Sequence, residues 1–319
     1  MKQGDRAVVV TVGETMALLA GAQIGSLAHA PTVTVGIGGA ESNVAIGLSR
    51  LGVPGAWVGR VGNDSFGDLV LRELRGEGIH VVEQRDSEAP TGLMVKEQRT
   101  AVATQVWYYR SGSAGSRLSV DDLPDHVILD AGVLHISGIT PALSDSAAKA
   151  VQHAVDLARS AGTTVSFDVN YRSQLWSPAE AAEALRPLVE ASDVLFAGVE
   201  EGRLFVPDVT DEADLGHALA AMGPREVVVK RGAAGALAVV DGKLYHQDAV
   251  PVDVVDTVGA GDAFIAGYLA ERLAGADVAT RLRTGALVGA FACTVRSDWQ
   301  GLPTRRDLEM GLDEIRVLR

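Results

Sequence analysis

The sequence contains only one cysteine, Cys293, and it is poor in basic residues relative to acidic ones. A lone cysteine excludes an intrachain disulfide, which fits a protein of a reducing compartment. Because Cys293 lies in an apolar run, we expect a small buried side chain. The 28 lysines and arginines face 41 aspartates and glutamates, which gives a formal net charge of −13. A chain this acidic repels nucleic-acid phosphates, and because no local basic stripe compensates, we expect no nucleic-acid partner.

Long hydrophobic runs are also missing. The longest charge-free apolar segment, residues 284–295, falls short of the ~20 residues that a membrane-spanning helix needs. Near the N-terminus, the apolar run 7–12 is interrupted by Gly13 and Glu14 and is too short for the core of a secretory signal. We therefore expect no membrane segment and a cytoplasmic protein.

The rest of the composition is that of an ordinary folded protein. The 319 residues are 47% hydrophobic and 22% charged, which argues against a disordered chain. At roughly 150 residues per domain, this length allows one large α/β domain or two smaller ones. No long linker, internal repeat or charge block divides the sequence, so we predict a single domain over residues 1–319.

Short Val-rich runs alternate with longer segments of helical spacing, as is typical of strands buried on both faces of a parallel sheet. The predicted strands are 7–12, 56–61, 133–137, 164–168, 194–197, 226–230 and 236–240. The predicted helices are 43–51, 66–75, 146–160, 178–191, 214–222, 261–273 and 278–295. This order predicts an α/β fold with a doubly wound, mostly parallel sheet, helices on both faces, and ligands at the carboxyl ends of the strands.

Two segments, residues 18–35 and 81–109, break this alternation. Within the second, 91–97 and 102–109 alternate in the manner of strands and show no helical period. We interpret these segments as a small accessory β-sheet that projects from the domain.

The segment DTVGAGDAF, residues 256–264, runs directly into a helical pattern. Its small residues Gly259, Ala260 and Gly261 let the backbone approach a ligand, and the helix start turns free N–H groups and a positive dipole end toward it. Asp262, on the first helical turn, is placed to take a proton from a hydroxyl while these amides hold a phosphoryl group. The same dipole predicts a low pKa for Asp262. The alternative is that Asp262 only caps the helix and the glycines only turn the chain.

A second glycine-containing segment, GGAESNVA, covers residues 38–45. Gly38 and Gly39 would allow a polar ligand to lie against the backbone. Asn43, at the predicted helix start, offers a donor and an acceptor for hydroxyls. An ordinary helix cap is an equally good interpretation of Asn43 alone.

Together these two segments resemble the two signatures of the PfkB (ribokinase-like) family of carbohydrate kinases. Further stretches are similar to the 2-keto-3-deoxygluconate kinases of that family: YYRSGSAGS at 108–116, LHISGITPAL at 134–143, DVNYR at 168–172 and LWSP at 175–178. The resemblance implies a ribokinase-like fold with a lid inserted at about 14–36 and 84–113. It also implies ATP-dependent phosphorylation of the terminal hydroxyl of 2-keto-3-deoxygluconate to the 6-phosphate.

The resemblance also implies which residues hold the sugar acid: Tyr108 and Arg110 from the lid, Arg172, and Asp298. On a strand, Tyr108 and Arg110 share one face while Tyr109 points away. Arginine suits a carboxylate because its guanidinium group can form two parallel hydrogen bonds with it. The alternative for the two arginines and for Asp298 is an ordinary surface charge.

For the nucleotide, KRGAAGA at 230–236 resembles the family's loop beside ATP. The nucleotide-facing positions that the resemblance implies are Asn170, Lys230, Gly232, Gly235 and 259–262. No Gly-x-x-x-x-Gly-Lys-Ser/Thr run and no Gly-x-Gly-x-x-Gly run occurs, so we expect neither a P-loop fold nor a dehydrogenase.

The metal assignment also comes from the resemblance, which implies Mg²⁺ bound with ATP and held by Glu201 directly or through water. Glu201 stands where the family has Asn-x-x-Glu, although Gly198 replaces the asparagine here. A monovalent cation is a further cofactor that the resemblance allows. The histidines form no zinc-type cluster in the sequence.

One substitution bears on the substrate: Met94 stands where close relatives have a tyrosine in the lid. This substitution bears on which sugar acid is preferred. The alternatives within the family are a 2-keto-3-deoxygalactonate kinase, a fructokinase or a ribokinase. A non-catalytic sugar-binding regulator is the alternative from another class, and the intact Gly259–Asp262 segment argues against it. Exposed lid edges predict a homodimer or a higher homo-oligomer.

Overall fold

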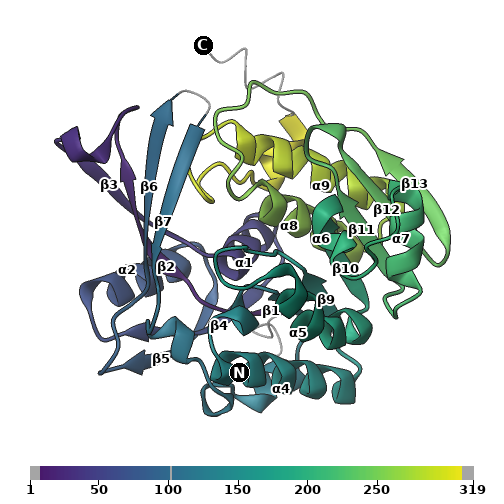
Figure 1. Ribbon diagram of the computed structural model, residues 1–319, viewed down its shortest axis with the longest axis horizontal. Coiled ribbons are helices and arrows are strands. Elements are labelled where there is room, and N and C mark those ends of the chain that lie inside the picture. Colours follow the sequence, from purple (N-terminus) through teal and green to yellow (C-terminus); the bar gives the residue numbers. More distant parts are fainter. Residues whose placement is uncertain (1–7, 101–102, 311–319) are drawn as a thin grey trace.

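The computed structural model describes residues 8–100 and 103–310. Within these residues one nine-stranded sheet forms the body of the molecule (Figure 1). All neighbouring strands are parallel except at β12, which is antiparallel to both of its neighbours. The order across the sheet is β13 (Lys243–Gln247), β12 (Ala236–Val240), β11 (Glu226–Lys230), β10 (Val194–Gly198), β9 (Thr164–Asp168), β8 (Val133–Ser137), β1 (Val9–Val12), β4 (Gly55–Gly62) and β5 (His80–Asp86).

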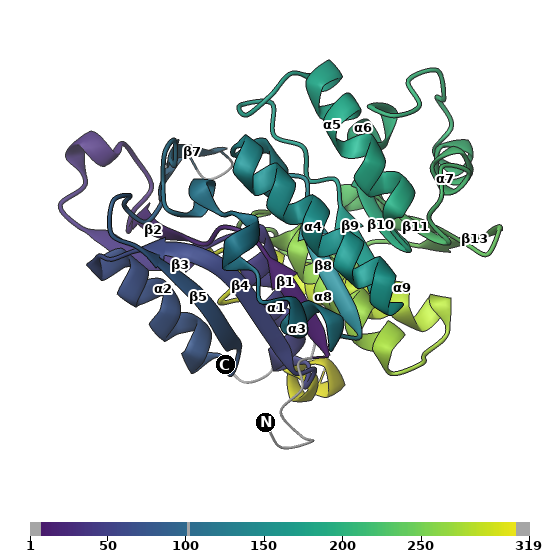
Figure 2. The ribbon, with the colours of Figure 1, turned by 90° about the horizontal axis from the view of Figure 1, so that it is seen from below.

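Helices cover both faces of this sheet, because its strands are apolar on both sides. In β1, Val9 packs into one hydrophobic cluster and Val10 into the other. Figures 1 and 2 show α8 and α9 across the sheet from α4 and α5. The helices on the Val9 side are α1 (Ala40–Arg50), α2 (Ser65–Gly76), α8 (Ala260–Leu273) and α9 (Val278–Cys293). Those on the Val10 side are α3 (Asp125–Leu129), α4 (Asp145–Ala161), α5 (Pro178–Ala191), α6 (Val199–Arg203) and α7 (Glu212–Ala220).

A second, four-stranded sheet stands apart from the body, on the left of Figure 1, and we call it the lid. Its order is β3 (Val33–Gly38), β2 (Met16–Gly21), β6 (Leu93–Thr100) and β7 (Ala103–Tyr109). Only β2 and β6 run parallel to each other. The accessory sheet predicted from the sequence is therefore present, and so is the mostly parallel sheet with helices on both faces.

Three details differ from the sequence prediction. His80–Asp86 belongs to the main sheet, where it pairs with β4, and not to the accessory sheet. Helix α1 begins at Ala40 with Gly39 as its N-cap, so Asn43 lies one turn inside the helix and is not a cap. Ala7 and Val102, where two predicted strands begin, lie outside the described residues.

The other helix ends follow local sequence signals. Ser177 accepts a hydrogen bond from the amide of Glu180, the Glu180 carboxylate accepts one in return, and Pro178 occupies the first turn of α5. Gly162, at φ 73°, ends α4 in the left-handed conformation. No helix in the described part of the chain is long and apolar enough to cross a membrane.

Candidate active site

A cleft of about 1000 Å³ opens at the carboxyl ends of the parallel strands and extends beneath the lid. Asp168, Gly198 and Lys230, the last residues of β9, β10 and β11, all face it. This is the edge at which open α/β sheets bind ligands. Most of the predicted site residues line this cleft: Gly39, Asn43, Tyr108, Arg110, Asn170, Arg172, Glu201, Lys230, Gly259, Gly261, Asp262 and Asp298.

The remaining predicted residues lie beside the cleft or away from it. Gly38 packs against two lining residues, because a Cβ there would overlap Met94 and come within 2.5 Å of Asp298 Oδ2. Ala260 starts α8 between two lining glycines. Gly232 and Gly235 shape the turn between β11 and β12, both with positive φ, and neither is among the described residues that line the cleft.

Asp262 lies on the first turn of α8, as the sequence predicts. Its Oδ2 accepts a hydrogen bond of 2.8 Å from Asn43 Nδ2, which joins the two glycine-containing segments at the cleft. The other side-chain atom of Asn43, Oδ1, is buried and has no hydrogen-bond partner among the described residues. A buried polar atom without a partner is costly, so Oδ1 is available to a ligand hydroxyl.

The prediction of a low pKa for Asp262 is wrong. Burial, opposed by the hydrogen bond from Asn43 and reinforced by the nearby charge of Asp168, raises its pKa from 3.8 to about 7. Lys230 and Arg172 act in the opposite direction but do not cancel the effect of burial. A carboxyl group with this pKa is suited to accepting a proton near neutral pH.

The backbone that leads into α8 comes close to its surroundings. Gly259 has a φ of 79°, and a Cβ at this position would overlap the carbonyl oxygen of Asp298. A Cβ at Gly261 would approach only the Lys230 ammonium group, at 3.5 Å. The first amides of a 14-residue helix therefore border the cleft without side chains over them, as a phosphate-binding helix start requires.

A charged group lies on the floor beside Asp262. Lys230 Nζ is 2.6 Å from Asp168 Oδ1. Burial opposes the charged form of Lys230, but Asp168 and Glu201 raise its pKa above the ordinary value, so the ammonium group stays charged. Glu201 accepts hydrogen bonds from the backbone amides of Tyr171 (3.1 Å) and Gly198 (2.5 Å). Its carboxylate is fixed at the cleft edge.

The two arginines predicted to hold an acid group differ in environment. Arg110 is buried, and its Nη2 lies 2.5 Å from Oε2 of Glu14, whose other oxygen, Oε1, accepts a hydrogen bond from the Ser113 hydroxyl. Its guanidinium carbon lies 5.8 Å from the centre of the Tyr108 ring. Arg172 is exposed and donates to the backbone oxygen of Tyr171. Arg110 therefore lines the cleft with Glu14 as its ion-pair partner, whereas the side chain of Arg172 is exposed to solvent.

Four cleft residues with buried ionisable side chains were not among the predicted site residues: Glu14, Glu41, Lys96 and Asp168. Glu41 accepts hydrogen bonds from Ser137 (2.7 Å) and Thr140 (2.9 Å), and its pKa is raised because burial outweighs these bonds. The signal for Glu14 was its place two residues after the buried strand β1, and that for Glu41 its place two residues after a pair of glycines.

Asp298 is not a surface carboxylate, because only 5% of its surface is exposed. Its Oδ1 lies 3.1 Å from Lys96 Nζ, which is also 2.6 Å from Asp256 Oδ2. Lys96 is on β6, two residues after Met94, and both line the cleft. The lid thus contributes a buried cation to the site.

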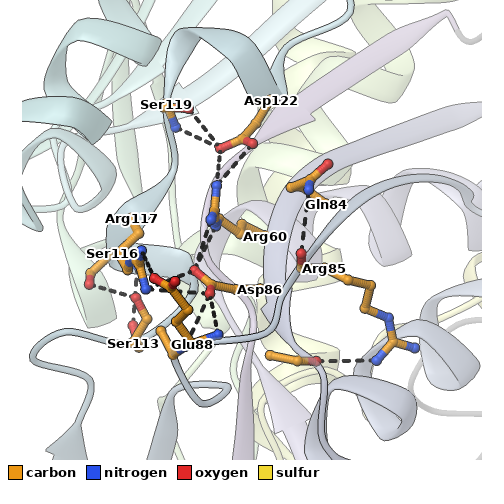
Figure 3. A network of polar contacts seen from close by, with 12 residues as sticks. Arg60, Gln84, Arg85, Asp86, Glu88, Ser113, Ser116, Arg117, Ser119 and Asp122 are labelled. Carbon is orange, nitrogen blue, oxygen red and sulfur yellow. Dashed lines mark hydrogen bonds and ion pairs between the residues drawn. The ribbon is translucent and has the colours of Figure 1, made fainter.

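Another polar network surrounds the end of β5, from which the chain continues to the lid strand β6 (Figure 3). Arg60 on β4 lies between Asp86 (2.9 Å) and Asp122 (3.1 Å). Asp86 also accepts from the amides of Glu88 and Ala89, in the segment that leads to β6. Burial opposes ionisation of Asp86, but these amides and Arg60 lower its pKa below the ordinary value. The network orders the chain where the lid begins.

Comparison with known proteins identifies the class that this fold and site define. Residues 6–305 match the model of the pfkB family carbohydrate kinases. The chain belongs to this family and is a carbohydrate kinase.

Three relatives show how close the similarity is. A 2-dehydro-3-deoxygluconokinase of Bacillus subtilis is 37% identical over 97% of this chain and 96% of its own length. A 2-dehydro-3-deoxygalactonokinase of Haloferax volcanii is 38% identical over 92% of each chain. The crystal structure of a putative ribokinase II from E. coli, in complex with ATP and Mg²⁺, superimposes with a TM-score of 0.88 at 27% identity, covering 98% of this chain and 99% of the other.

Proposed function

We propose that this carbohydrate kinase transfers the terminal phosphoryl group of ATP to the terminal hydroxyl of 2-keto-3-deoxygluconate and forms the 6-phosphate. The observation that carries the proposal is one cleft that holds Asp262 beside a helix start and two arginines, Arg110 and Arg172. The 2-dehydro-3-deoxygluconokinase of B. subtilis, similar over nearly the full length, supports the same substrate.

In the proposed reaction, Asp262 accepts the proton of the attacking hydroxyl. Asn43 fixes the carboxylate through the 2.8 Å hydrogen bond and offers its free Oδ1 to the sugar. The amides around Gly259 to Gly261 stabilise the transferring phosphoryl group, with Lys230 adding positive charge beside them. Because such transition states are usually analysed as loose, orienting the hydroxyl matters more than the strength of the base.

At the other end of the sugar, Arg172 and Arg110 bind the carboxylate, and Tyr108 packs beside Arg110. Asp298 and the backbone at Gly38 and Gly39 bind hydroxyls. The lid then excludes water, which limits hydrolysis of ATP.

ATP and Mg²⁺ are the proposed co-substrate and metal, as in the E. coli neighbour crystallised with both. No group of three His, Cys, Asp or Glu that could hold a metal occurs among residues 8–100 and 103–310. This suits Mg²⁺ bound mainly by phosphates and waters, with Glu201 as a ligand directly or through water. Asn170, Lys230 and the turn at Gly232 and Gly235 are the proposed nucleotide contacts.

Four further expectations remain proposals: the single domain over residues 1–319, dependence on a monovalent cation, assembly through the lid and a cytoplasmic location. The exposed apolar side chains of the lid support assembly, with Val35 57% and Tyr109 65% exposed. Analytical ultracentrifugation of the purified protein measures the number of subunits. To test dependence on a monovalent cation, kinase activity is compared in K⁺, Na⁺ and a bulky organic cation at constant ionic strength.

The galacto epimer is the second candidate, because the 2-dehydro-3-deoxygalactonokinase of H. volcanii is 38% identical to this chain. The test compares kcat/KM for 2-keto-3-deoxygluconate, its galacto epimer, fructose and ribose, with the position of the phosphate determined by NMR. We expect the gluco acid to be the best substrate. A large preference for fructose or ribose would contradict the binding of a carboxylate, and sugar binding without turnover would favour a regulator.

A further inference from the structure

Lys96 is a buried lysine that belongs to the lid but makes its ion pairs with the body. It projects from β6, and its side chain is 9% exposed. Its ammonium nitrogen lies 2.6 Å from Asp256 Oδ2 and 3.1 Å from Asp298 Oδ1. Asp256 starts the segment that leads into α8, and Asp298 lies in the segment after α9. One side chain therefore ties the lid to two separate parts of the site.

Both aspartates are themselves held against the helix start that carries Asp262. Asp256 Oδ1 accepts a hydrogen bond of 3.1 Å from the amide of Val258, inside the DTVGAGD segment. Gly259 packs so closely on the carbonyl oxygen of Asp298 that a Cβ would overlap it. Movement of either aspartate would therefore move the backbone that borders the cleft.

The positions and the ionisation of Asp256 and Asp298 depend on the charge of Lys96. Asp256, Asp298 and Lys96 are all less than a tenth exposed, and one cation faces two carboxylates. Burial raises the pKa of Asp298, with Asp256 acting in the same direction and Lys96 opposing both. A buried carboxylate that loses its partner is strongly destabilised, so without Lys96 one of the two aspartates would take up a proton or move toward water.

We propose that Lys96 is a positioning residue for phosphoryl transfer, which aligns the sugar-facing carboxylate of Asp298 with the helix start when the lid lies over the cleft. The proposal rests on the kinase activity of the family and on the assignment of Asp298 to the sugar side of the cleft. It does not depend on which sugar the cleft accepts.

The first test replaces Lys96 by Met, which keeps the length and removes the charge, and by Arg, which keeps the charge. The matched control is Arg99→Met, an exposed cation on the same strand. With the best sugar of the wild type, we expect Lys96→Met to lower kcat/KM about 10- to 100-fold, through both kcat and the KM of the sugar. Lys96→Arg should recover most of this loss, and Arg99→Met should match the wild type.

The pH dependence of kcat/KM distinguishes a positioning role of Lys96 from a role in stability alone. In Lys96→Met, the acid limb of kcat/KM should move to higher pH, because Asp298 holds its proton more tightly without the lysine. Folded Lys96→Met protein with kcat and KM within twofold of wild type would overturn the proposal. So would an equal loss at every pH, since that assigns Lys96 to stability alone.

A second variant covers the case in which Lys96→Met does not fold. Lys96→Met combined with Asp256→Asn removes the excess negative charge and keeps Asp298. We expect this variant to fold and to remain at least about 10-fold below the wild type in kcat/KM. Full activity would overturn the proposal. Because each assay uses the sugar that the wild type prefers, failure of 2-keto-3-deoxygluconate as a substrate would be seen separately.

Discussion

The body and the lid hold their site residues by different means. The body strands are buried on both faces between two large hydrophobic clusters, and their last residues enter the cleft from a rigid frame. The lid has a cluster of only three buried hydrophobic residues, Met16, Leu18 and Met94, and the first half of β3 is exposed. The charged residues that the lid brings to the cleft are held instead by buried ion pairs: Lys96 on β6 with two aspartates, and Arg110, directly after β7, with Glu14.

This difference indicates a division of labour. Packed strands and helix starts position the reacting groups, because dense packing tolerates little displacement. Buried ion pairs add little net stability, yet they are strongly directional and breaking one is costly. They can therefore fix how a small sheet sits over the cleft without requiring a large core. Substitutions in the body and in the lid should therefore have different effects.

The body should carry the chemical step. Asp262→Asn removes the proton acceptor while keeping the size of the side chain and a partner for Asn43. We expect kcat to fall by roughly 10³-fold or more, with the KM of the sugar within a few-fold of the wild type. Steady-state kinetics with purified protein measure both. Retention of a tenth of the wild-type kcat would remove Asp262 from the role of base.

The helix start should tolerate no side chain at Gly259. Gly259→Ala places a Cβ on the carbonyl of Asp298 at a φ of 79°, and we expect about 10²-fold lower kcat with a lower Tm. Gly275→Ala is the control, because its φ is 74° but its Cβ would meet nothing within 4 Å. It should cost about 1 kcal/mol of stability and no activity. Equal effects of the two variants would show that backbone strain alone is responsible.

The two arginines should separate substrate binding from stability. Arg110→Met and Arg172→Met should each raise the KM for a sugar acid about 10- to 100-fold. Only Arg110→Met leaves a buried carboxylate, Glu14, without its partner, so it alone should lose about 3 kcal/mol of stability. Chemical denaturation and kinetics on the same samples measure both. An unchanged KM in both variants would contradict the carboxylate site.

The pH dependence follows from the raised pKa of Asp262. The proposed role of Asp262 as proton acceptor requires its ionised carboxylate, so kcat/KM should rise with pH through about 7, level off above it, and be about tenfold below the plateau at pH 6. A plateau that extends down to pH 5 would contradict the assignment.

The contribution of Asp262 to the free energy of unfolding should fall as pH rises, whereas activity should increase. The folded protein binds the Asp262 proton more tightly than the unfolded chain, so this carboxyl group destabilises the fold as pH rises from 3.8 through about 7. Asp262→Asn should therefore be more stable than the wild type at pH 8 and nearly equal to it at pH 4. The cost is roughly 1.4 kcal/mol per pH unit between the two pKa values, and thermal unfolding at both pH values measures it.

The smallest expected effect lies in the lid. Met94→Tyr places a hydroxyl on the cleft face of β6, beside Gly38, where the family resemblance of the sequence implies a tyrosine. We expect the ratio of kcat/KM for the gluco and galacto acids to change a few-fold, with kcat for the better substrate nearly constant. Competition between the two epimers measures the ratio directly, and an unchanged ratio would exclude Met94 as a determinant of substrate choice.

The sequence predicted the body better than the lid, for physical reasons. The strands β8, β9, β11 and β12 end where predicted, because continuous apolar runs are local signals. The strand His80–Asp86 was assigned to the wrong sheet, because the alternation of apolar and polar residues within a strand does not show which strand it pairs with. Asp262 was found through its helix start, which is also local.

The buried charges could not be found in this way. Glu14 is 96 residues from Arg110, and Lys96 is 202 residues from Asp298. No periodicity links such partners, and an isolated Glu or Lys in a sequence normally belongs to a solvated surface. The raised pKa of Asp262 was missed for a related reason, because burial in the folded cleft outweighs the helix dipole.

The most direct test is a crystal structure with 2-keto-3-deoxygluconate and a non-hydrolysable ATP analogue. We predict that the terminal hydroxyl oxygen lies about 2.6–3.2 Å from a carboxylate oxygen of Asp262, with the acid group of the sugar on Arg110 and Arg172. A sugar bound in the reverse orientation, or with its terminal hydroxyl far from Asp262, would contradict the account.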